Sequence, residues 1–366
     1  MWFILDDALA NTDLTSTESR SGLEQILYAV AKGEHAIAGS AMVIKAIVDK
    51  VAMSPVPQGV LRTIFNKSPT ILDGANKAPF RIRIIAGVQE PMRGSEGEWA
   101  ISLAWVADHG VPLSHVLAED IVDAELYIHC AWHYAAFTRT GMKVSLHPLN
   151  GGGTRTCEVQ KSEIARMKNF VLCVTDSDKS CPTAPLSRTS KDCASAAKES
   201  VFPTLHICLE EREIENLIPY NLIYDAIGEL SSDHVRRLDD IGQFVPSNDV
   251  HWKFLDLKEG TSLTVLFHDV SREFWRTLVN NVKNTATSIA HCLSKSACFP
   301  SSGTKCNCYI TPPLSPNIAV TVLNYVKVRG HHNNAKRAST SGNFSRWQDV
   351  GASLSAWGAA MPKQRS

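Results

Sequence analysis

The sequence predicts an α/β protein with a mainly parallel sheet flanked by helices. The clearest strand is the short apolar run Phe170–Val174, which leads directly into polar turn residues. Such a run is typical of a strand that is buried on both faces in a parallel sheet. Three more strand patterns alternate with helical patterns between residues 111 and 225, as expected of strands joined by crossover helices.

The elements of this segment follow one another in a regular order. A helix is expected to begin at Asp120, where a carboxylate can accept hydrogen bonds from free N–H groups, and to continue to about Thr138. A second helix continues to about Met167. The fourth strand contains His206, which is expected to be a sheet residue. In chain order, the expected strands are Ser114–Ala118, Met142–Leu146, Phe170–Val174 and Phe202–Leu209.

Residues 1–110 are expected to form a separate α/β domain of unknown role. Its expected elements are the strand Trp2–Leu5, the helices Gly22–Lys32, Ala41–Val51 and Val60–Phe65, and the strand Phe80–Ala86. Asp6 and Asp7 follow the first strand, where PIN-type nucleases also carry an acid. Because the segment has no matching set of later acids, a packing or partner-binding domain is the preferred interpretation.

Acidic side chains follow three of the four strands in the segment 111–225. Glu119 comes after the first strand, Asp176 and Asp178 come after the third, and Glu213 and Glu215 lie beyond the fourth. Ligand sites of open α/β sheets lie at the carboxyl ends of strands, so these side chains could meet there. A few carboxylates suffice to hold Mg²⁺ for phosphodiester cleavage. Taken alone, Asp-x-Asp also fits ordinary turn or cap chemistry.

The order of these acids resembles the TOPRIM domain, the metal-binding fold of topoisomerases, DnaG-type primases and OLD-family nucleases. That family has a Glu after the first strand, usually followed by Gly and Asp, and then Asp-x-Asp after the third strand. Glu119, Asp123 and the pair Asp176 and Asp178 match this pattern, whereas Asp120 stands where many members have Gly. The string Arg-Glu-Ile-Glu-Asn-Leu-Ile-Pro at 212–219 resembles the segment that supplies a later acid in OLD-like phage-defence proteins.

The resemblance implies a site for Mg²⁺ or Mn²⁺ and a role for each acid. The expected direct ligands are Glu119, Asp176 and Asp178. The residues expected to complete a second metal position or to orient waters are Asp123 and either Glu213 or Glu215. OLD-like nucleases also recruit a lysine from beyond the acidic motifs, so Lys258 or Lys253 is the candidate for transition-state stabilisation, against an ordinary exposed lysine.

Residues 226–328 are expected to form a mainly helical C-terminal region that contains a cysteine cluster. Four thiols within seventeen residues could close a tetrahedral structural Zn²⁺ site, although the spacing is not the usual pair of Cys-x2-Cys motifs. Unligated thiols in a loop fit equally well. The four residues are Cys292, Cys298, Cys306 and Cys308.

Composition predicts a cytoplasmic protein without a membrane span. The formal net charge is zero, which argues against a nucleic-acid contact spread over the whole surface. No apolar run reaches the roughly 18 to 20 residues that span a bilayer. The ten cysteines are scattered, as is typical of a reducing compartment. Residues 329–366 are basic and rich in small residues, so we expect a flexible tail that could contact phosphates.

The expected function is therefore a metal-dependent nuclease acting on DNA or RNA. By the same resemblance, it would serve in anti-phage defence beside an ATPase partner. A strand-passing or primase-like TOPRIM protein is the alternative among enzymes, but Tyr28, the tyrosine that precedes the core, lies in an apolar helical pattern that favours packing. A catalytically silent binding or sensor subunit is the alternative outside enzymes.

Overall fold

The structure is a computed structural model that describes residues 1–87, 90–95, 97–139, 141–229, 232–242, 250–266, 268–281 and 309–364. The chain forms two compact units. The first contains residues 1–174, 192–207 and 349–366, and the second contains residues 175–191 and 208–348. The chain therefore crosses between the units several times, and the expected boundaries at residues 110, 225 and 328 do not coincide with these crossings.

The first unit contains a five-stranded sheet in the order β2-β1-β3-β5-β4. All its strands run parallel except β4, which is antiparallel to β5. Its strands are β1 (Trp2–Leu5), β2 (Ala36–Gly39), β3 (Arg81–Ile85), β4 (Met92–Arg93) and β5 (Glu98–Ser102). The helices of this region are η1 (Asp7–Asn11), α1 (Thr17–Ala31), α2 (Ala41–Lys50), α3 (Pro55–Asn66), α4 (Ser68–Lys77) and α5 (Leu103–His109).

Three of these helices begin at serine residues that follow a loop or a strand. The Ser16, Ser40 and Ser102 side chains each accept a hydrogen bond from the N–H three residues later. This is the local chemistry that starts α1, α2 and α5, since a serine hydroxyl satisfies a helix N–H that has no partner within the helix.

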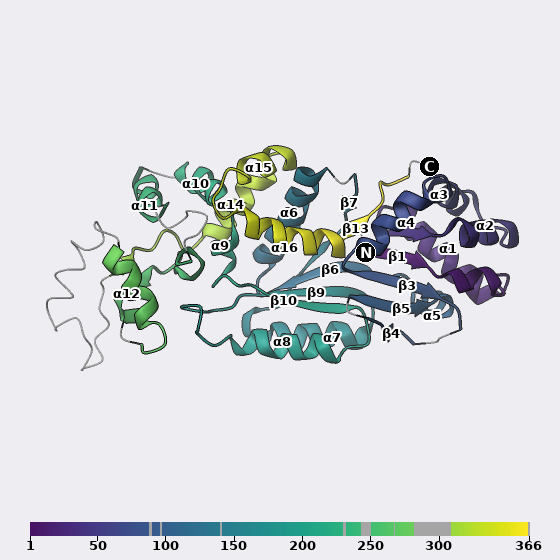
Figure 1. Cartoon of the computed structure of the whole chain (residues 1–366), viewed down its shortest axis with the longest axis horizontal. Coiled ribbons are helices and arrows are strands. Elements are labelled where there is room, and N and C mark those ends of the chain that lie inside the picture. The colour runs from purple at the N-terminus through teal and green to yellow at the C-terminus, as the bar shows by residue number, and fades with distance from the viewer. Residues whose placement is uncertain are drawn as a thin grey trace. The chain divides into compact units, whose positions relative to one another are not determined.

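A second sheet has the order β10-β9-β6-β8. Its strands are β6 (Leu113–Ala118), β8 (His147–Asn150), β9 (Asn169–Thr175) and β10 (Thr204–Cys208). β6 runs parallel to both of its neighbours, β8 and β9. The helices between these strands are α6 (Ile121–Thr138), η2 (Gly153–Arg155), α7 (Thr156–Arg166) and α8 (Arg188–Glu199). Figure 1 shows α7 and α8 on one face of this sheet and α6 on the other. The expectation of parallel sheets flanked by helices is confirmed.

The second strand was expected at Met142–Leu146, but the strand of the main sheet lies later in the chain, at His147–Asn150. Residues 143–144 form β7 (Lys143–Val144), which pairs with β13 (Ala359–Ala360) outside the main sheet. The strand that pairs with β6 is β8, in which Pro148 lies opposite Val116. Proline has no N–H to donate, and β8 tolerates it because it is an edge strand.

The C-terminal segment is folded rather than the flexible tail expected from its composition. Residues 331–338 form α15 (His331–Ala338) and residues 344–357 form α16 (Phe344–Trp357). In the first unit, the buried Trp357 indole contacts Trp99 and Phe80 edge-on, with ring centroids 5.8 and 5.7 Å apart. The rings of Trp99 and Phe80 give Trp357 an apolar environment, which the polar composition of residues 329–366 does not suggest.

The second unit is mainly helical. Its elements include α9 (Ile214–Leu217), α10 (Tyr220–Gly228), α11 (Ser232–Gly242), η3 (Trp252–Phe254), β11 (Thr261–Ser262), η4 (Leu263–Leu266), α12 (Arg272–Asn281), β12 (Tyr309–Thr311) and α14 (Ile318–Lys327). The segment His251–Gly260 contains no strand: it is the 3-10 helix η3, an extended residue at Leu255 and a turn at residues 257–259.

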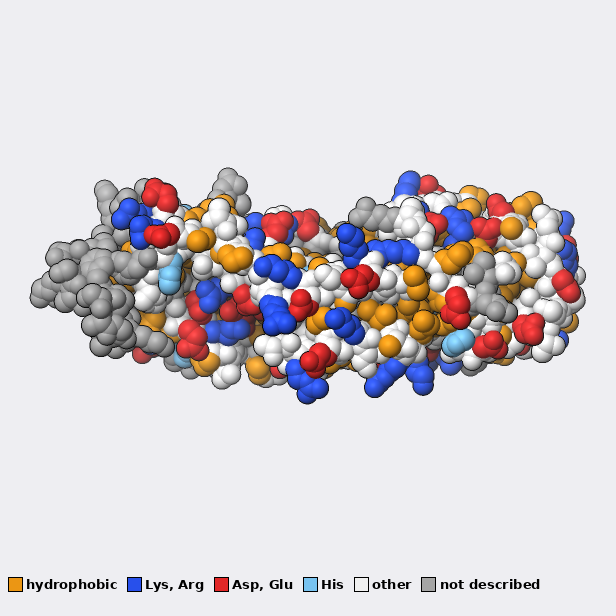
Figure 2. Space-filling view, turned by 90° about the horizontal axis from the view of Figure 1, so that it is seen from below, with side chains coloured by type: hydrophobic (Ala, Val, Ile, Leu, Met, Phe, Trp, Pro, Cys, Tyr) orange, Lys and Arg blue, Asp and Glu red, His pale blue; other side chains and the backbone are white. Residues whose placement is uncertain are grey.

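The surface reflects the balanced charge of the chain. On the face shown in Figure 2, basic and acidic side chains are interspersed, with apolar side chains between them. Among the described residues, no helix combines the length and apolarity needed to cross a bilayer.

Candidate functional site

The chain that leaves β9 is held against the chain that leaves β10. The buried Ser177 hydroxyl donates a hydrogen bond of 2.6 Å to the carbonyl of Glu211. The N–H of Asp178 donates to the carbonyl of Arg212 at 3.0 Å. Asp178 is exposed and has a φ of 55°, a left-handed conformation that aspartate tolerates better than most residues. Asp176 is half-buried. These bonds therefore fix the Asp-x-Asp segment beside the acidic segment after β10.

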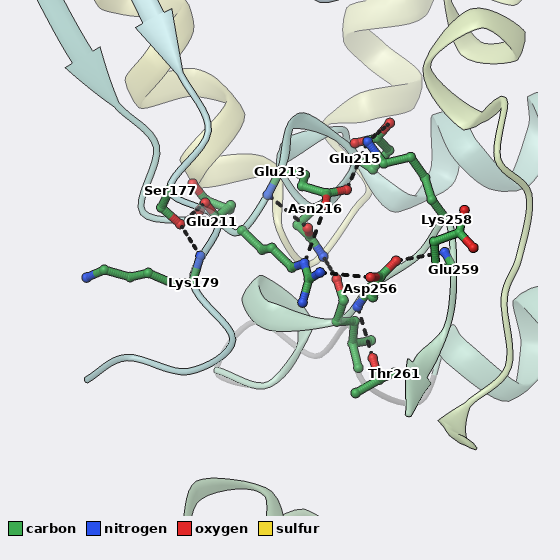
Figure 3. A network of polar contacts seen from close by, with 12 residues as sticks. Ser177, Lys179, Glu211, Glu213, Glu215, Asn216, Asp256, Lys258, Glu259 and Thr261 are labelled. Atoms are coloured by element: carbon green, nitrogen blue, oxygen red, sulfur yellow. Dashed lines mark hydrogen bonds and ion pairs between the residues drawn. The ribbon is translucent and has the colours of Figure 1, made fainter. Parts of the chain in front are cut away.

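The acidic segment itself alternates between buried and more exposed carboxylates. Glu211 and Glu215 are only 1% and 3% exposed, whereas Glu213 is half-buried and Glu210 is exposed. Figure 3 shows Glu211, Glu213 and Glu215 along this stretch, which ends in the short helix α9. Burying two carboxylates within five residues is costly unless cations or hydrogen-bond donors accompany them.

Asn216 joins the acidic segment to the loop that carries the candidate lysines. Its side-chain amide donates to the carbonyls of Trp252 and Leu255 at 2.8 and 3.0 Å. Its own carbonyl accepts the indole N–H of Trp252 at 2.7 Å. The N–H of Glu213 in turn donates to the Asn216 side-chain oxygen at 3.3 Å. The buried amide thus sets the position of residues 252–255 relative to the acids.

The turn that carries Lys258 is held by a second set of contacts. Arg212 donates to Asp256 at 2.8 Å, and the other Asp256 oxygen accepts the N–H of Glu259 at 2.7 Å. Gly260 ends the turn with a φ of 82°, and a Cβ at this position would lie 2.7 Å from the backbone nitrogen of Pro313. Glycine is required there for both conformation and space.

Lys258 lies among the carboxylates, as Figure 3 shows. Its ammonium is 3.0 Å from Glu213 and 3.4 Å from Glu215. Burial alone would lower the pKa of Lys258, but attraction to Glu215 and Glu213, a hydrogen bond to Glu213 and attraction to Asp176 raise it overall. Lys258 therefore stays charged, and Asp176 belongs to the same electrostatic cluster as the two glutamates.

The carboxylates of this cluster keep oxygens that have no hydrogen-bond donor within the described part of the chain. These are one buried oxygen of Glu215 and one of Glu211. The pKa of Glu215 is raised, chiefly by burial and further by the Glu213 charge, although Lys258 opposes the shift. A buried carboxylate oxygen without a donor is well suited to bind a cation or a proton.

The other expected acids belong to the first unit. Glu119 directly follows β6, and Asp123 lies in the first turn of α6. Asp120 is the cap of that helix as expected, because its carboxylate accepts the N–H of Val122 at 2.8 Å. The proximity of Glu119 and Asp123 to the acids of the second unit stays a prediction.

The three glycines at 151–153 form a loop that follows β8 and hydrogen-bonds to the end of β6, which explains why glycine is needed there. The N–H of Gly151 donates to the Ala118 carbonyl at 2.8 Å, and the N–H of Gly153 donates to the Glu119 carbonyl at 2.9 Å. A Cβ at Gly151 would lie 2.7 Å from the Ala118 oxygen, and Gly152 and Gly153 have φ values of 72° and 64°. The glycines thus allow the loop to pass close to the backbone of Ala118 and Glu119.

The other residues singled out from sequence have the following positions and contacts. Lys253 pairs with Glu210 at 3.1 Å rather than with the acids around Lys258. Tyr28, on α1, is 38% exposed, and its hydroxyl lies 2.7 Å from that of Ser54. His206 lies on β10 as expected, and burial lowers its pKa to about 4. The residues proposed for zinc, Cys292, Cys298, Cys306 and Cys308, lie outside the described residues.

Sequence reasoning missed three members of the cluster. Glu211 lies in the acidic run, but the sequence does not show that it is more buried than the neighbouring Glu210. Arg212 and Asp256 pair across 44 positions of the chain, so no local pattern connects them. An arginine within a run of glutamates was the one available signal that some of those acids have an internal partner.

Searches of protein-family models, curated proteins and solved structures return no match for this chain. The interpretation of the site therefore depends on its residues and their contacts.

Proposed function

We propose that the protein is a divalent-metal-dependent nuclease with a TOPRIM-like site. The observation that carries this proposal is the carboxylate cluster of the second unit, in which buried Glu211 and Glu215 oxygens have no hydrogen-bond donor. The cluster lies where the chain leaves β9 and β10, and ligand sites of parallel sheets lie at such strand ends.

The chemistry of these side chains suits a hard cation, since Mg²⁺ and Mn²⁺ prefer carboxylates and water to nitrogen or sulfur. In the proposal, Asp176, Glu213 and Glu215 supply its oxygen ligands; in the described structure their oxygens do not all lie within 4.8 Å of one another, so binding would draw them together. When bound, such a cation neutralises charge on a phosphoryl oxygen and activates a water molecule. Asp178 joins this set in the proposal as a further ligand. Glu119 and Asp123, which lie in the first unit, belong to the set of metal-site residues that the TOPRIM resemblance implies.

Lys258 has a separate role in the proposal. Its charge is held in place by Glu213 and Glu215 and is retained at all ordinary pH values because its pKa is raised. A fixed ammonium beside the metal ligands would stabilise negative charge as it develops on the phosphoryl group. It would also offset the repulsion between the two glutamates before a cation binds.

One observation favours a second candidate function. Because Lys258 already pairs with both glutamates, the cluster can also be stable as a purely structural ion-pair network. The protein would then be a catalytically silent binding or sensor subunit.

Assays of the purified chain with plasmid DNA, single-stranded DNA and RNA test the proposal. We expect cleavage with Mg²⁺ or Mn²⁺, none with EDTA, and none by Asp176→Asn. Wild-type activity in Asp176→Asn would reject the site. Absence of hydrolysis with every metal and substrate would favour the silent subunit. A cytoplasmic location, an ATPase partner and a role in phage defence belong to the same proposal and rest on the family resemblance.

A further inference from the structure

A second charged group lies beside the carboxylate cluster and is centred on Glu210. One Glu210 oxygen is contacted by the Lys253 ammonium at 3.1 Å and by the Arg346 guanidinium at 3.2 Å. Arg346 also donates to buried Glu211 at 3.1 Å. Two cations from distant parts of the chain therefore converge on a single carboxylate oxygen.

The exposure of these side chains is unequal. The Glu210 side chain is 60% exposed, whereas those of Lys253 and Arg346 are 30% and 28% exposed. An exposed carboxylate contributes little to stability through such pairs, typically less than about 1 kcal/mol, so it can leave at small cost. The two cations are the fixed part of the group, and the carboxylate is the replaceable part.

Backbone and side-chain contacts hold the cations in position. The carbonyl of Lys253 accepts the N–H of Arg212 at 2.7 Å, which ties it to the residue two positions after Glu210. Arg346 lies in the first turn of α16, just after Asn343, whose amide donates to the Ile218 carbonyl at 2.9 Å. The backbone of Lys253, the start of α16 and the contact of Arg346 with Glu211 are therefore positioned without the Glu210 side chain.

We propose that Lys253 and Arg346 form a clamp for one phosphodiester group of a nucleic acid, and that the Glu210 carboxylate fills this clamp until a phosphate displaces it. This inference rests on the proposed nuclease function, because it names where the substrate backbone is held. Arginine and lysine bind phosphate and carboxylate oxygens by the same chemistry.

The charge balance of the clamp matches a phosphodiester. With Glu211 retained by Arg346, removal of the Glu210 charge leaves one net positive charge among these side chains. A phosphodiester carries one negative charge and replaces the carboxylate without leaving an uncompensated ion. A local clamp of this kind also suits a chain whose formal net charge is zero.

The test is oligonucleotide binding in EDTA, measured by fluorescence anisotropy with labelled single-stranded DNA and RNA at several salt concentrations. Glu210→Gln should bind about three- to tenfold more tightly, because the internal competitor is gone. Lys253→Ala should bind about tenfold more weakly and reduce the salt slope by about one. The loss from Lys253→Ala should be larger in the Glu210→Gln background.

Matched controls separate the clamp from overall charge. Glu273→Gln and Lys336→Ala make the same charge changes at exposed positions of the second unit and should leave affinity unchanged. The clamp is rejected if Glu210→Gln behaves like Glu273→Gln, if Lys253→Ala behaves like Lys336→Ala, or if no variant binds an oligonucleotide. If these effects appear but no metal supports cleavage, the clamp stands and the proposed nuclease chemistry fails.

Discussion

Two groups of charged side chains lie next to strands in this protein, one on the N-terminal sheet and one in the second unit. On the sheet, Glu98 accepts hydrogen bonds from Arg81 at 2.6 Å and from Arg83 at 3.3 Å, and Arg83 also contacts Asp6 at 3.3 Å. In the second unit, Glu211, Glu213 and Glu215 occur within five residues, and two of them keep a buried oxygen without a donor.

The difference between the groups lies in how the acids are compensated. Burial alone would raise the pKa of Glu98, but the hydrogen bonds from Arg81 and Arg83 lower it overall. The pKa of Glu215 is raised because burial outweighs the attraction of Lys258. Fully compensated charges across neighbouring strands are explained by structure alone, whereas the incompletely compensated buried acids are the ones on which the proposed metal site rests. Asp6, which invites comparison with PIN-type nucleases, thus belongs to the compensated group.

The largest expected effect is on catalysis. Asp176→Asn or Glu215→Gln should reduce the cleavage rate by about 100-fold or more, since each removes a proposed metal ligand. Asp269→Asn changes a 91% exposed carboxylate of the same unit and should leave the rate unchanged. Cleavage assays with Mn²⁺ compare the variants directly. Equal rates for Glu215→Gln and Asp269→Asn would mean that Glu215 does not take part in catalysis. The two groups would then differ only in how their acids are compensated.

The next effect is metal-dependent stability. Mn²⁺ at 100 times its dissociation constant should stabilise the protein by about 2.7 kcal/mol through the carboxylate cluster. Glu215→Gln should abolish most of this gain, whereas Glu98→Gln should retain it. Thermal unfolding with and without Mn²⁺ measures both. A metal-induced shift that survives in Glu215→Gln would assign the cation to another site.

His206 in the first unit and Glu215 in the second should contribute to the pH dependence of stability with opposite signs. The pKa of His206 is about 4 in the folded first unit, below its ordinary value of 6.5, so stability is full above pH 6.5 and falls at lower pH. By linkage the loss between pH 7.5 and 5 is about 2 kcal/mol. Buried His35, whose pKa is also lowered, chiefly by burial, acts in the same direction. Glu215 acts oppositely, because its raised pKa favours the protonated, folded form as the pH falls.

Urea unfolding of wild type and His206→Gln at both pH values measures this effect. We expect the variant to lose less stability than wild type on acidification, by about 2 kcal/mol. An equal loss in both proteins would mean that His206 is protonated normally in the folded state.

The smallest effect concerns the compensated group. Glu98→Ala leaves Arg81 and Arg83 without their shared carboxylate and should destabilise the protein by about 1 to 2 kcal/mol. Because these residues have no part in the proposed metal site, the cleavage rate of the folded protein should not change. Chemical denaturation and cleavage assays of Glu98→Ala check both statements, and reduced cleavage at unchanged stability would contradict the structural role.

Elements with complete local signals were predictable from sequence. The helix expected from Asp120 to about Thr138 is α6, because its cap and its long run of helix-forming residues lie within one stretch of chain. Strands buried on both faces, such as β9, were equally clear. By contrast, β8 was misplaced, because Pro148 suggests a break and only its edge position makes it acceptable. The C-terminal helices were missed because their polar composition conceals the buried Trp347 and Trp357.

For the site, the acids that follow each strand could be predicted from the sequence, since that order is a property of the chain. Which of these acids are buried, and which cations compensate them, depends on the folded structure. Lys258 meets Glu213 and Glu215 from more than forty residues away, and Arg346 meets Glu210 from a distance of 136 residues. Burial and Coulomb attraction depend on distance in space, which no spacing along the chain specifies.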